Sequence, residues 1–123
     1  MKRVSTTHAP AAVGPYSQAT VAGNTVYVSG MLGPDPQGVM SEGIAGQTER
    51  AIRNLAVILE ASGSDLAHVV KTTCYLAHIA DFAAFNEVYG GFFSERPARS
   101  CIEAAALPKG ALVEIDAIAV TKE

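Results

Sequence analysis

The chain is organised around the stretch Pro97-Ala98-Arg99-Ser100-Cys101-Ile102-Glu103, whose alternating side chains predict a β-strand. Arg99, Cys101 and Glu103 fall on one face of this strand, and the intervening residues fall on the other. An arginine in so apolar a chain needs an anionic partner, because burying an unpaired charge is costly. Its planar guanidinium group matches a carboxylate through two parallel hydrogen bonds. The alternative is an arginine on an edge strand whose head group lies in water.

A second strand is predicted over residues 111–121, and it carries two acids among apolar neighbours. Glu114 and Asp116 share one face of this strand. The turn at 107–110 is short, so we expect the two strands to be neighbours and Arg99 to approach Glu114, within one chain or across an interface. One interpretation is a structural ion pair between Arg99 and either acid. The other is an anion anchor and a general base that share one cavity.

The remaining sequence predicts an α+β fold with the element order β-β-α-β-α-β-β. The elements are expected at residues 19–22, 25–29, 44–62, 68–76, 82–93, 97–105 and 111–121. Residues 1–14 are expected to form an entry segment before the first element, and the buried stripe of the second helix is expected to consist of Phe82, Phe85, Tyr89 and Phe92. Both helices can cover only one face of the sheet. The last strand is apolar on both sides, so the other face must also be covered, which predicts a homo-oligomer.

Length and composition suit one domain over residues 1–123, with 49% hydrophobic and 17% charged residues. The formal net charge is −3 and the basic residues form no run, which argues against nucleic-acid binding. No apolar run approaches the ~20 residues of a membrane span and no signal peptide is recognisable, so we expect a soluble, cytoplasmic protein. Cys74 and Cys101 are expected to be packed free thiols rather than nucleophiles. The histidine and cysteine spacings match no metal site.

The chain resembles the Rid family, the reactive intermediate deaminases, and in particular the imine deaminases among them. The resemblance extends over nearly the whole chain, from about residue 8 to about residue 121. The matching motifs are residues 9–18, 28–30, 70–73, 81–83 with Asn86, 97–103, 107–109 and 113–119. The Arg-Ser-Cys motif followed by Glu-Ile-Asp-Ala is the most specific part of this pattern.

The resemblance implies a chorismate-mutase-like fold, a mixed sheet with two helices on one face, and a homotrimer with ligand clefts between subunits. It also implies hydrolysis of 2-iminobutanoate and 2-iminopropanoate to 2-oxo acids and ammonia, with no metal and no organic cofactor. Arg99 would bind the substrate carboxylate, Glu114 would activate the water, and Cys101 would contribute mainly backbone groups. The other residues that would line the cleft are Tyr16, Gly30 and Asn86.

The chain departs from the family pattern at two places, and both are predicted to border the pocket for the substrate side chain. The link at residues 94–96 is short, and Met31-Leu32-Gly33 follows Gly30 where a glutamine is expected. Two alternative functions use the same cleft or the same family resemblance. One is a non-catalytic ligand-binding or chaperone-like protein, and the other is a ribonuclease, against which the acidic net charge argues.

Overall fold

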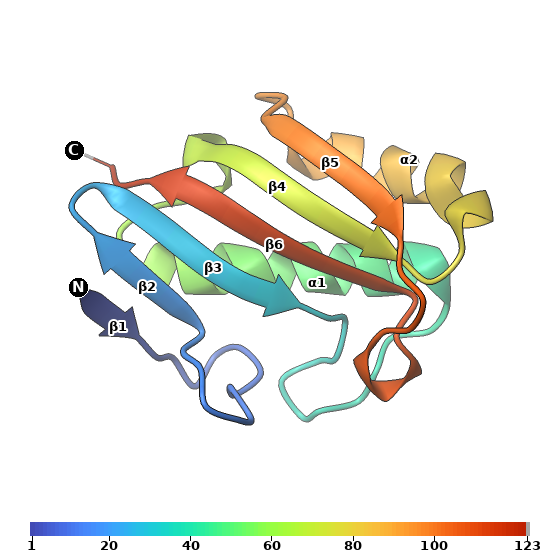
Figure 1. Cartoon of the computed structure of the whole chain (residues 1–123), viewed down its shortest axis with the longest axis horizontal. Coiled ribbons are helices and arrows are strands. Elements are labelled where there is room, and N and C mark those ends of the chain that lie inside the picture. Colours follow the sequence, from blue (N-terminus) through green and yellow to red (C-terminus); the bar gives the residue numbers. More distant parts are fainter. Residues whose placement is uncertain (123) are drawn as a thin grey trace.

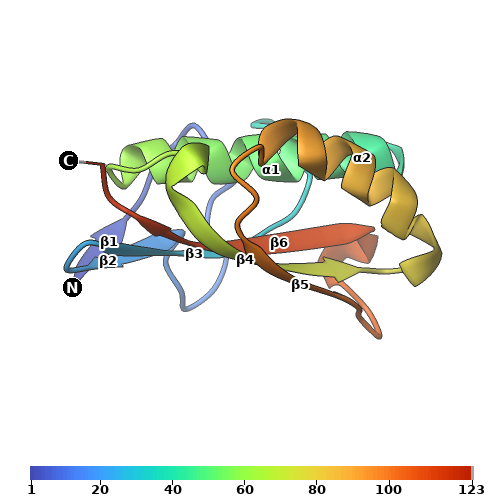
Figure 2. The same cartoon turned by 90° about the horizontal axis from the view of Figure 1, so that it is seen from above.

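A computed structural model describes residues 1–122 of the chain. Its strands are β1 (Lys2–Val4), β2 (Ala19–Ala22), β3 (Thr25–Met31), β4 (Val69–Leu76), β5 (Ala98–Glu103) and β6 (Val113–Val120), and its α-helices are α1 (Gly43–Ala61) and α2 (Phe82–Phe92). The strands form a sheet in the order β1-β2-β3-β6-β4-β5, with β4 and β5 parallel and the other neighbours antiparallel. Figures 1 and 2 show both helices on the same face of this mixed sheet, which confirms the predicted α+β arrangement. None of the helices in the described part is long and apolar enough to cross a membrane.

The structure adds one strand that the sequence did not predict and corrects one predicted pairing. β1 lies in the entry segment, for which no element was predicted, and pairs with β2; its three residues are too few to show an alternating pattern. β5 and β6 were expected to be neighbours, but β4 lies between them and pairs with both. The cause is α2, which carries the chain from β4 to β5 in the kind of crossover that parallel neighbours require.

Helix α1 covers the centre of the sheet with a buried apolar stripe. Its Ile52 and Leu55 have no exposed surface, and neither do Val113 and Ile115 of β6, with which they share one core. Each such side chain contributes about 1.5–3 kcal/mol when fully buried. Gly63 follows the helix with a φ of +82°, the left-handed conformation that a residue with a Cβ disfavours, so the helix ends there as predicted.

The aromatic stripe of α2 differs from the prediction at both of its ends. Phe85 and Tyr89 are buried as expected, but Phe82 is 38% exposed and Phe92 is only partly buried. Phe93 enters the core instead, because the chain leaves helical geometry at this residue and turns its side chain inward. The helix therefore keeps one aromatic ring partly open at its first turn.

Within residues 1–122, no helix or further strand covers the face of the sheet opposite the helices (Figure 2). On β6 this face carries the partly buried Glu114, Asp116 and Ile118, which alternate with fully buried residues. Among its large apolar side chains, Tyr27 is 47% exposed and Ile102 is 52% exposed. An apolar surface that accompanies partly buried acids is a physical reason to expect another chain on this face.

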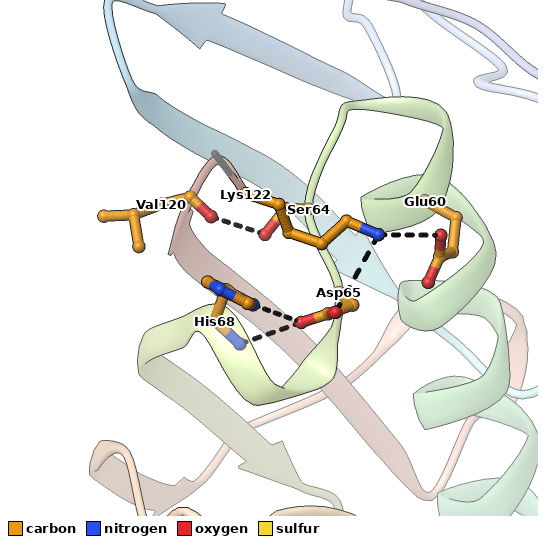
Figure 3. A network of polar contacts seen from close by, with 6 residues as sticks. All are labelled: Glu60, Ser64, Asp65, His68, Val120 and Lys122. Carbon is orange, nitrogen blue, oxygen red and sulfur yellow. Dashed lines mark hydrogen bonds and ion pairs between the residues drawn. The ribbon is translucent and has the colours of Figure 1, made fainter.

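A polar network ties the end of α1 and the start of β4 to the C-terminal end of β6 (Figure 3). Asp65 accepts hydrogen bonds from the backbone N–H of His68 at 3.1 Å and from its Nδ1 at 2.6 Å. The hydrogen bond from His68 lowers the pKa of the Asp65 carboxyl group. Lys122 Nζ lies 3.9 Å from the same carboxylate, and Ser64 Oγ donates to the Val120 carbonyl at 2.6 Å. The network thus connects residues 60–68 to the residues at the end of β6, away from Glu114 near its start.

Candidate active site

Arg99 lies on the edge strand β5 and extends over α2 rather than into water. Its Nη1 donates a hydrogen bond to Asn86 Oδ1 at 2.8 Å. Its guanidinium carbon lies 4.8 Å from the ring centroid of Tyr89, 5.4 Å from that of Phe82 and 5.7 Å from that of Phe85. None of the ion pairs within residues 1–122 includes Arg99. The interpretation as a structural ion pair between Arg99 and an acid of β6 is therefore not realised within one chain.

The aromatic support under Arg99 is itself held by buried hydrogen bonds. Tyr89 OH and Thr72 Oγ1 lie 2.7 Å apart, and Cys74 Sγ donates to the same Thr72 hydroxyl at 3.8 Å. Burial raises the pKa of Tyr89, and it raises the pKa of the Cys74 thiol to about 12, so both groups stay protonated near neutral pH. The sequence interpretation assigned Tyr89 to the core alone. Its position three residues after Asn86 on the same helix face was the signal that connects it to Arg99.

A cavity of about 450 Å³ opens beside Arg99 at the C-terminal end of α2. Its lining consists of Asn86, Tyr89, Gly90, Phe93, Ser94, Arg96, Pro97 and Arg99. The short link at residues 94–96 contributes two of these residues, so it borders the cavity beside Arg99. Arg96 adopts a φ of +54°, an uncommon conformation for a residue other than glycine.

Glu114 lies on the open face of β6, against the backbone of Gly30 on β3. A β-bulge between Val28 and Met31 brings Gly30 to this position. A Cβ atom at Gly30 would overlap Glu114 Oε2 and would lie 2.8 Å from the carboxyl carbon, so only glycine leaves room for the carboxylate. Burial raises the pKa of Glu114, and the negative charge of Asp116 raises it further.

A second cavity, of about 350 Å³, surrounds Glu114 and Gly30. Its lining consists of Pro10, Ala11, Ala12, Val13, Tyr16, Gln18, Gly30, Met31, Leu32, Pro34, Pro108, Lys109 and Glu114. Tyr16 therefore joins Gly30 and Glu114, and Met31 also lines this cavity. Lys109 was assigned to a turn only. The resemblance of the 107–109 motif to the family was the one indication that this lysine lies near the acid.

One chain places the predicted site residues in two separate groups. Arg99 pairs in register with the buried Thr72 on the helix side of the sheet, whereas Glu114 pairs with Tyr75 on the open side. The predicted single cavity with both side chains is therefore not formed within one chain. Cys101 lines neither cavity, and burial raises the pKa of its thiol, although the charge of Arg99 opposes the rise.

The group around Arg99 and the group around Glu114 supply complementary chemistry. The first offers a cation held over aromatic rings, and the second offers a carboxylate with a raised pKa in a largely apolar cavity. Within residues 1–122, no group of three or more His, Cys, Asp or Glu side chains is placed to hold a metal ion. A cation can fix an anionic substrate, and a carboxylate can accept a proton from water.

The chain is similar to known proteins over nearly its whole length. The family model described as endoribonuclease L-PSP matches residues 6–121. A human protein named 2-iminobutanoate/2-iminopropanoate deaminase is 47% identical over 120 residues, which cover 95% of this chain and 88% of that protein. The crystal structure of RidA from an Antarctic Psychrobacter is 47% identical with a TM-score of 0.94, covering 98% of this chain and 99% of that one. The crystal structure of Escherichia coli TdcF with bound serine is 37% identical with a TM-score of 0.95, covering 99% and 100%.

Proposed function

Because the chain belongs to the endoribonuclease L-PSP family, we propose that it hydrolyses 2-imino acids such as 2-iminobutanoate and 2-iminopropanoate. Water adds to the C=N carbon, the carbon–nitrogen bond then breaks, and the products are a 2-oxo acid and ammonia. The observation that carries this proposal is that one chain holds both a guanidinium group fixed without an acidic partner among the described residues and a partly buried carboxylate. The family membership confirms the predicted resemblance to the reactive intermediate deaminases.

Arg99 serves as the anchor for the substrate carboxylate. Its guanidinium group is already held by Asn86 and by three aromatic rings, so little conformational freedom remains to be lost on binding. A hydrogen bond between charged groups contributes about 1.5–3 kcal/mol. Arg99→Ala should therefore raise KM by about tenfold or more, whereas Arg99→Lys keeps the charge and loses the two-pronged geometry.

Glu114 serves as the general base that orients the water. A protonated imine is already electrophilic. The protein is needed to hold a water molecule beside the C=N carbon and to remove a proton from that water as it attacks. Glu114 accepts one proton from this water and returns it to the nitrogen of the addition product. The carbon–nitrogen bond then breaks, and the remaining hydroxyl proton passes to the departing ammonia as the C=O bond forms, which gives the 2-oxo acid and ammonium. The raised pKa makes the carboxylate a stronger base, and a positioned base typically adds about 10²–10⁴ in rate.

The complete site lies between two copies of the chain, within a homotrimer. The support is that Arg99 and Glu114 occupy opposite sides of one sheet, so a cleft that holds both needs Arg99 from one copy and Glu114 from another. The uncovered sheet face carries Glu114 together with exposed apolar residues such as Tyr27 and Ile102, which suits burial against a second copy. The predicted small-acid ligand would then bind at the subunit boundary.

Subunit complementation tests this proposal directly. Arg99→Ala and Glu114→Gln chains are purified separately and after co-expression, and 2-oxo acid release is followed with an amino-acid oxidase as the imine source. Each variant alone should be inactive, whereas random mixed oligomers should recover about one quarter of the wild-type activity, because one site in four then receives both native residues. An inactive mixture of verified hetero-oligomers would refute a shared site. Light scattering should give the mass of three chains.

The family description also names an endoribonuclease, and the same preparations decide between the two activities. RNA binding depends on several basic contacts to phosphates, and the formal net charge of this chain is −3. We expect no RNA cleavage above that of a mock preparation. Cleavage that survives Arg99→Ala and further purification would support the ribonuclease, and binding of 2-oxo acids without any turnover would support a non-catalytic binding protein.

A further inference from the structure

The cavity at the C-terminal end of α2 carries a second arginine besides Arg99. Arg96 and Arg99 both line this cavity of about 450 Å³, which shares no lining residue with the cavity around Glu114. We infer that it binds ligands with two acid groups, 2-oxo or 2-imino diacids, with one carboxylate on Arg99 and the other on Arg96. This inference rests on the proposed function, from which it takes the anchor role of Arg99.

The two positive charges in this cavity have no acidic partner in the described part of the chain. None of the ion pairs there includes Arg96 or Arg99. The lining contains no Asp or Glu, and its uncharged polar side chains are those of Asn86, Tyr89 and Ser94. The C-terminal end of α2 adds roughly half a negative elementary charge, which is too little to balance two guanidinium groups. The cavity therefore favours a ligand with two negative charges over a ligand with one.

The backbone of Arg96 is held in a strained turn. Its φ of +54° lies in the left-handed region, where glycine fits at no cost and a residue with a Cβ does not. The backbone N–H of Arg96 donates to the Phe93 carbonyl at 3.1 Å, and Phe93 is only 3% exposed. Pro97 follows directly and disfavours the right-handed α conformation for the residue before it. An arginine where glycine would cost less indicates that its side chain is used.

One aromatic stack supports both arginines. The ring centroids of Tyr89 and Phe93 lie 4.5 Å apart. The guanidinium carbon of Arg99 lies 4.8 Å from the Tyr89 centroid, and the Arg96 backbone is bonded to Phe93. The two charges are thus attached to neighbouring members of a single packed unit. Only the Arg96 side chain remains to be ordered when a diacid binds, which limits the entropy lost on binding.

Calorimetry compares 2-oxoglutarate, which has two carboxylates, with its 5-methyl ester, which keeps the carbon chain and has one charge. The second guanidinium contact should make the diacid bind about tenfold more tightly at low ionic strength, and added salt should reduce this difference. Equal affinities would overturn the inference while leaving the proposed deaminase intact. If pyruvate, the ester and the diacid all fail to bind, the anchor role of Arg99 fails and this inference fails with it.

Variants of Arg96 separate binding from folding. Arg96→Gly removes the guanidinium group, and it should change the free energy of unfolding little, because relief of the left-handed strain offsets the greater freedom of glycine in the unfolded chain. The preference for the diacid should disappear in this variant, whereas the matched control Arg96→Lys keeps the charge and should retain part of it. A preference that persists in folded Arg96→Gly would overturn the inference.

Gly90 offers an independent test from the opposite direction. It lines the same cavity, and a Cβ there would meet nothing within 4 Å, so a longer side chain can be accommodated. Gly90→Glu adds a competing carboxylate and should lower the preference for the diacid about tenfold more than the matched Gly90→Gln does. Equal effects of the two substitutions would count against a charge-selective site.

Turnover shows how the diacid uses the site. A diacid on both arginines occupies the anchor of the substrate carboxylate, so 2-oxoglutarate should inhibit hydrolysis of the alanine imine competitively and about tenfold more strongly than its ester does. The glutamate imine, generated by glutamate oxidase with catalase, distinguishes the two ligand classes. Its accelerated hydrolysis would make diacid imines substrates, and inhibition without such turnover would make the 2-oxo diacid a competing ligand. Absence of any competition would overturn the shared use of Arg99.

Discussion

Replacement of Gly30 by alanine tests the arrangement of the base, because the added methyl group would occupy the space that Glu114 now fills. The Cβ would lie 2.8 Å from the Glu114 carboxyl carbon and 3.0 Å from its Cγ, whereas ordinary contacts begin at 3.4 Å. Gly30 is not among the glycines with positive φ, so the clash rather than backbone strain is the main effect. The carboxyl carbon of Glu114 must therefore move away by about 0.6 Å or more, which is the difference between 2.8 Å and the 3.4 Å of an ordinary contact.

A displacement of this size bears on catalysis more than on stability. A misplacement of about 1 Å in a catalytic arrangement costs about 10² in rate, and complete loss of a general base costs about 10²–10⁴. We therefore expect Gly30→Ala to lower kcat for imine hydrolysis by about 10². The free energy of unfolding should fall by less than about 2 kcal/mol, because a partly exposed carboxylate can swing aside.

Imine hydrolysis and denaturant unfolding are measured on four variants, namely Gly30→Ala, Gly91→Ala, Glu114→Ala and the double variant Gly30→Ala/Glu114→Ala. Gly91→Ala is the matched control, since a Cβ there meets nothing within 4 Å and lies outside both cavities. Gly30→Ala is also made in a Glu114→Ala background, where the carboxylate that would clash is absent. We expect no further loss in that background, and a full second loss of 10² would show that the methyl group acts on the substrate rather than on Glu114. Wild-type kcat in Gly30→Ala alone would refute the proposed position of the base.

Three further predictions follow from the titrating and buried groups. Glu114 must be ionised to accept a proton, so activity should rise with pH through the raised pKa of this carboxyl group. Asp116→Asn removes one of the two causes that raise this pKa, so the acidic limb of the kcat/KM profile should move to lower pH. A shift of that limb to higher pH would contradict the reasoning. Asp65→Ala should cost about 1 kcal/mol at neutral pH by removing the hydrogen bonds from His68 (Figure 3). Folding lowers the pKa of Asp65, so this contribution is fully present above the pKa of the unfolded state and is lost as pH falls through the pKa of the folded state. The unfolding free energies of the wild type and Asp65→Ala should therefore converge in acid. A difference between them that stays constant with pH would argue against this assignment. Tyr89→Phe removes a buried hydrogen bond and should lower the unfolding free energy by about 1–2 kcal/mol in a thermal or denaturant titration, whereas no change would mean that the partner hydroxyl finds another acceptor.

The sequence alone determined the elements and the faces on which most of their residues lie. Periods of 2 and 3.6 residues are properties of the local backbone, so they can be read from one segment at a time. The strands at residues 19–22 and 25–29 and the extent of α1 were predicted in this way. Arg99 and Cys101 were likewise placed on a common face, and the register with β4 agrees.

Only the tertiary structure decided which strands are neighbours. The short turn at 107–110 suggested that β5 and β6 pair, but β4 lies between them, because α2 carries the chain across to a parallel partner. Pairing between distant segments depends on which faces are buried together, and no local pattern encodes this. The register of β4 with both neighbours sets Arg99 and Glu114 on opposite sides of the sheet, so the two residues predicted for one cavity lie in two separate groups within one chain.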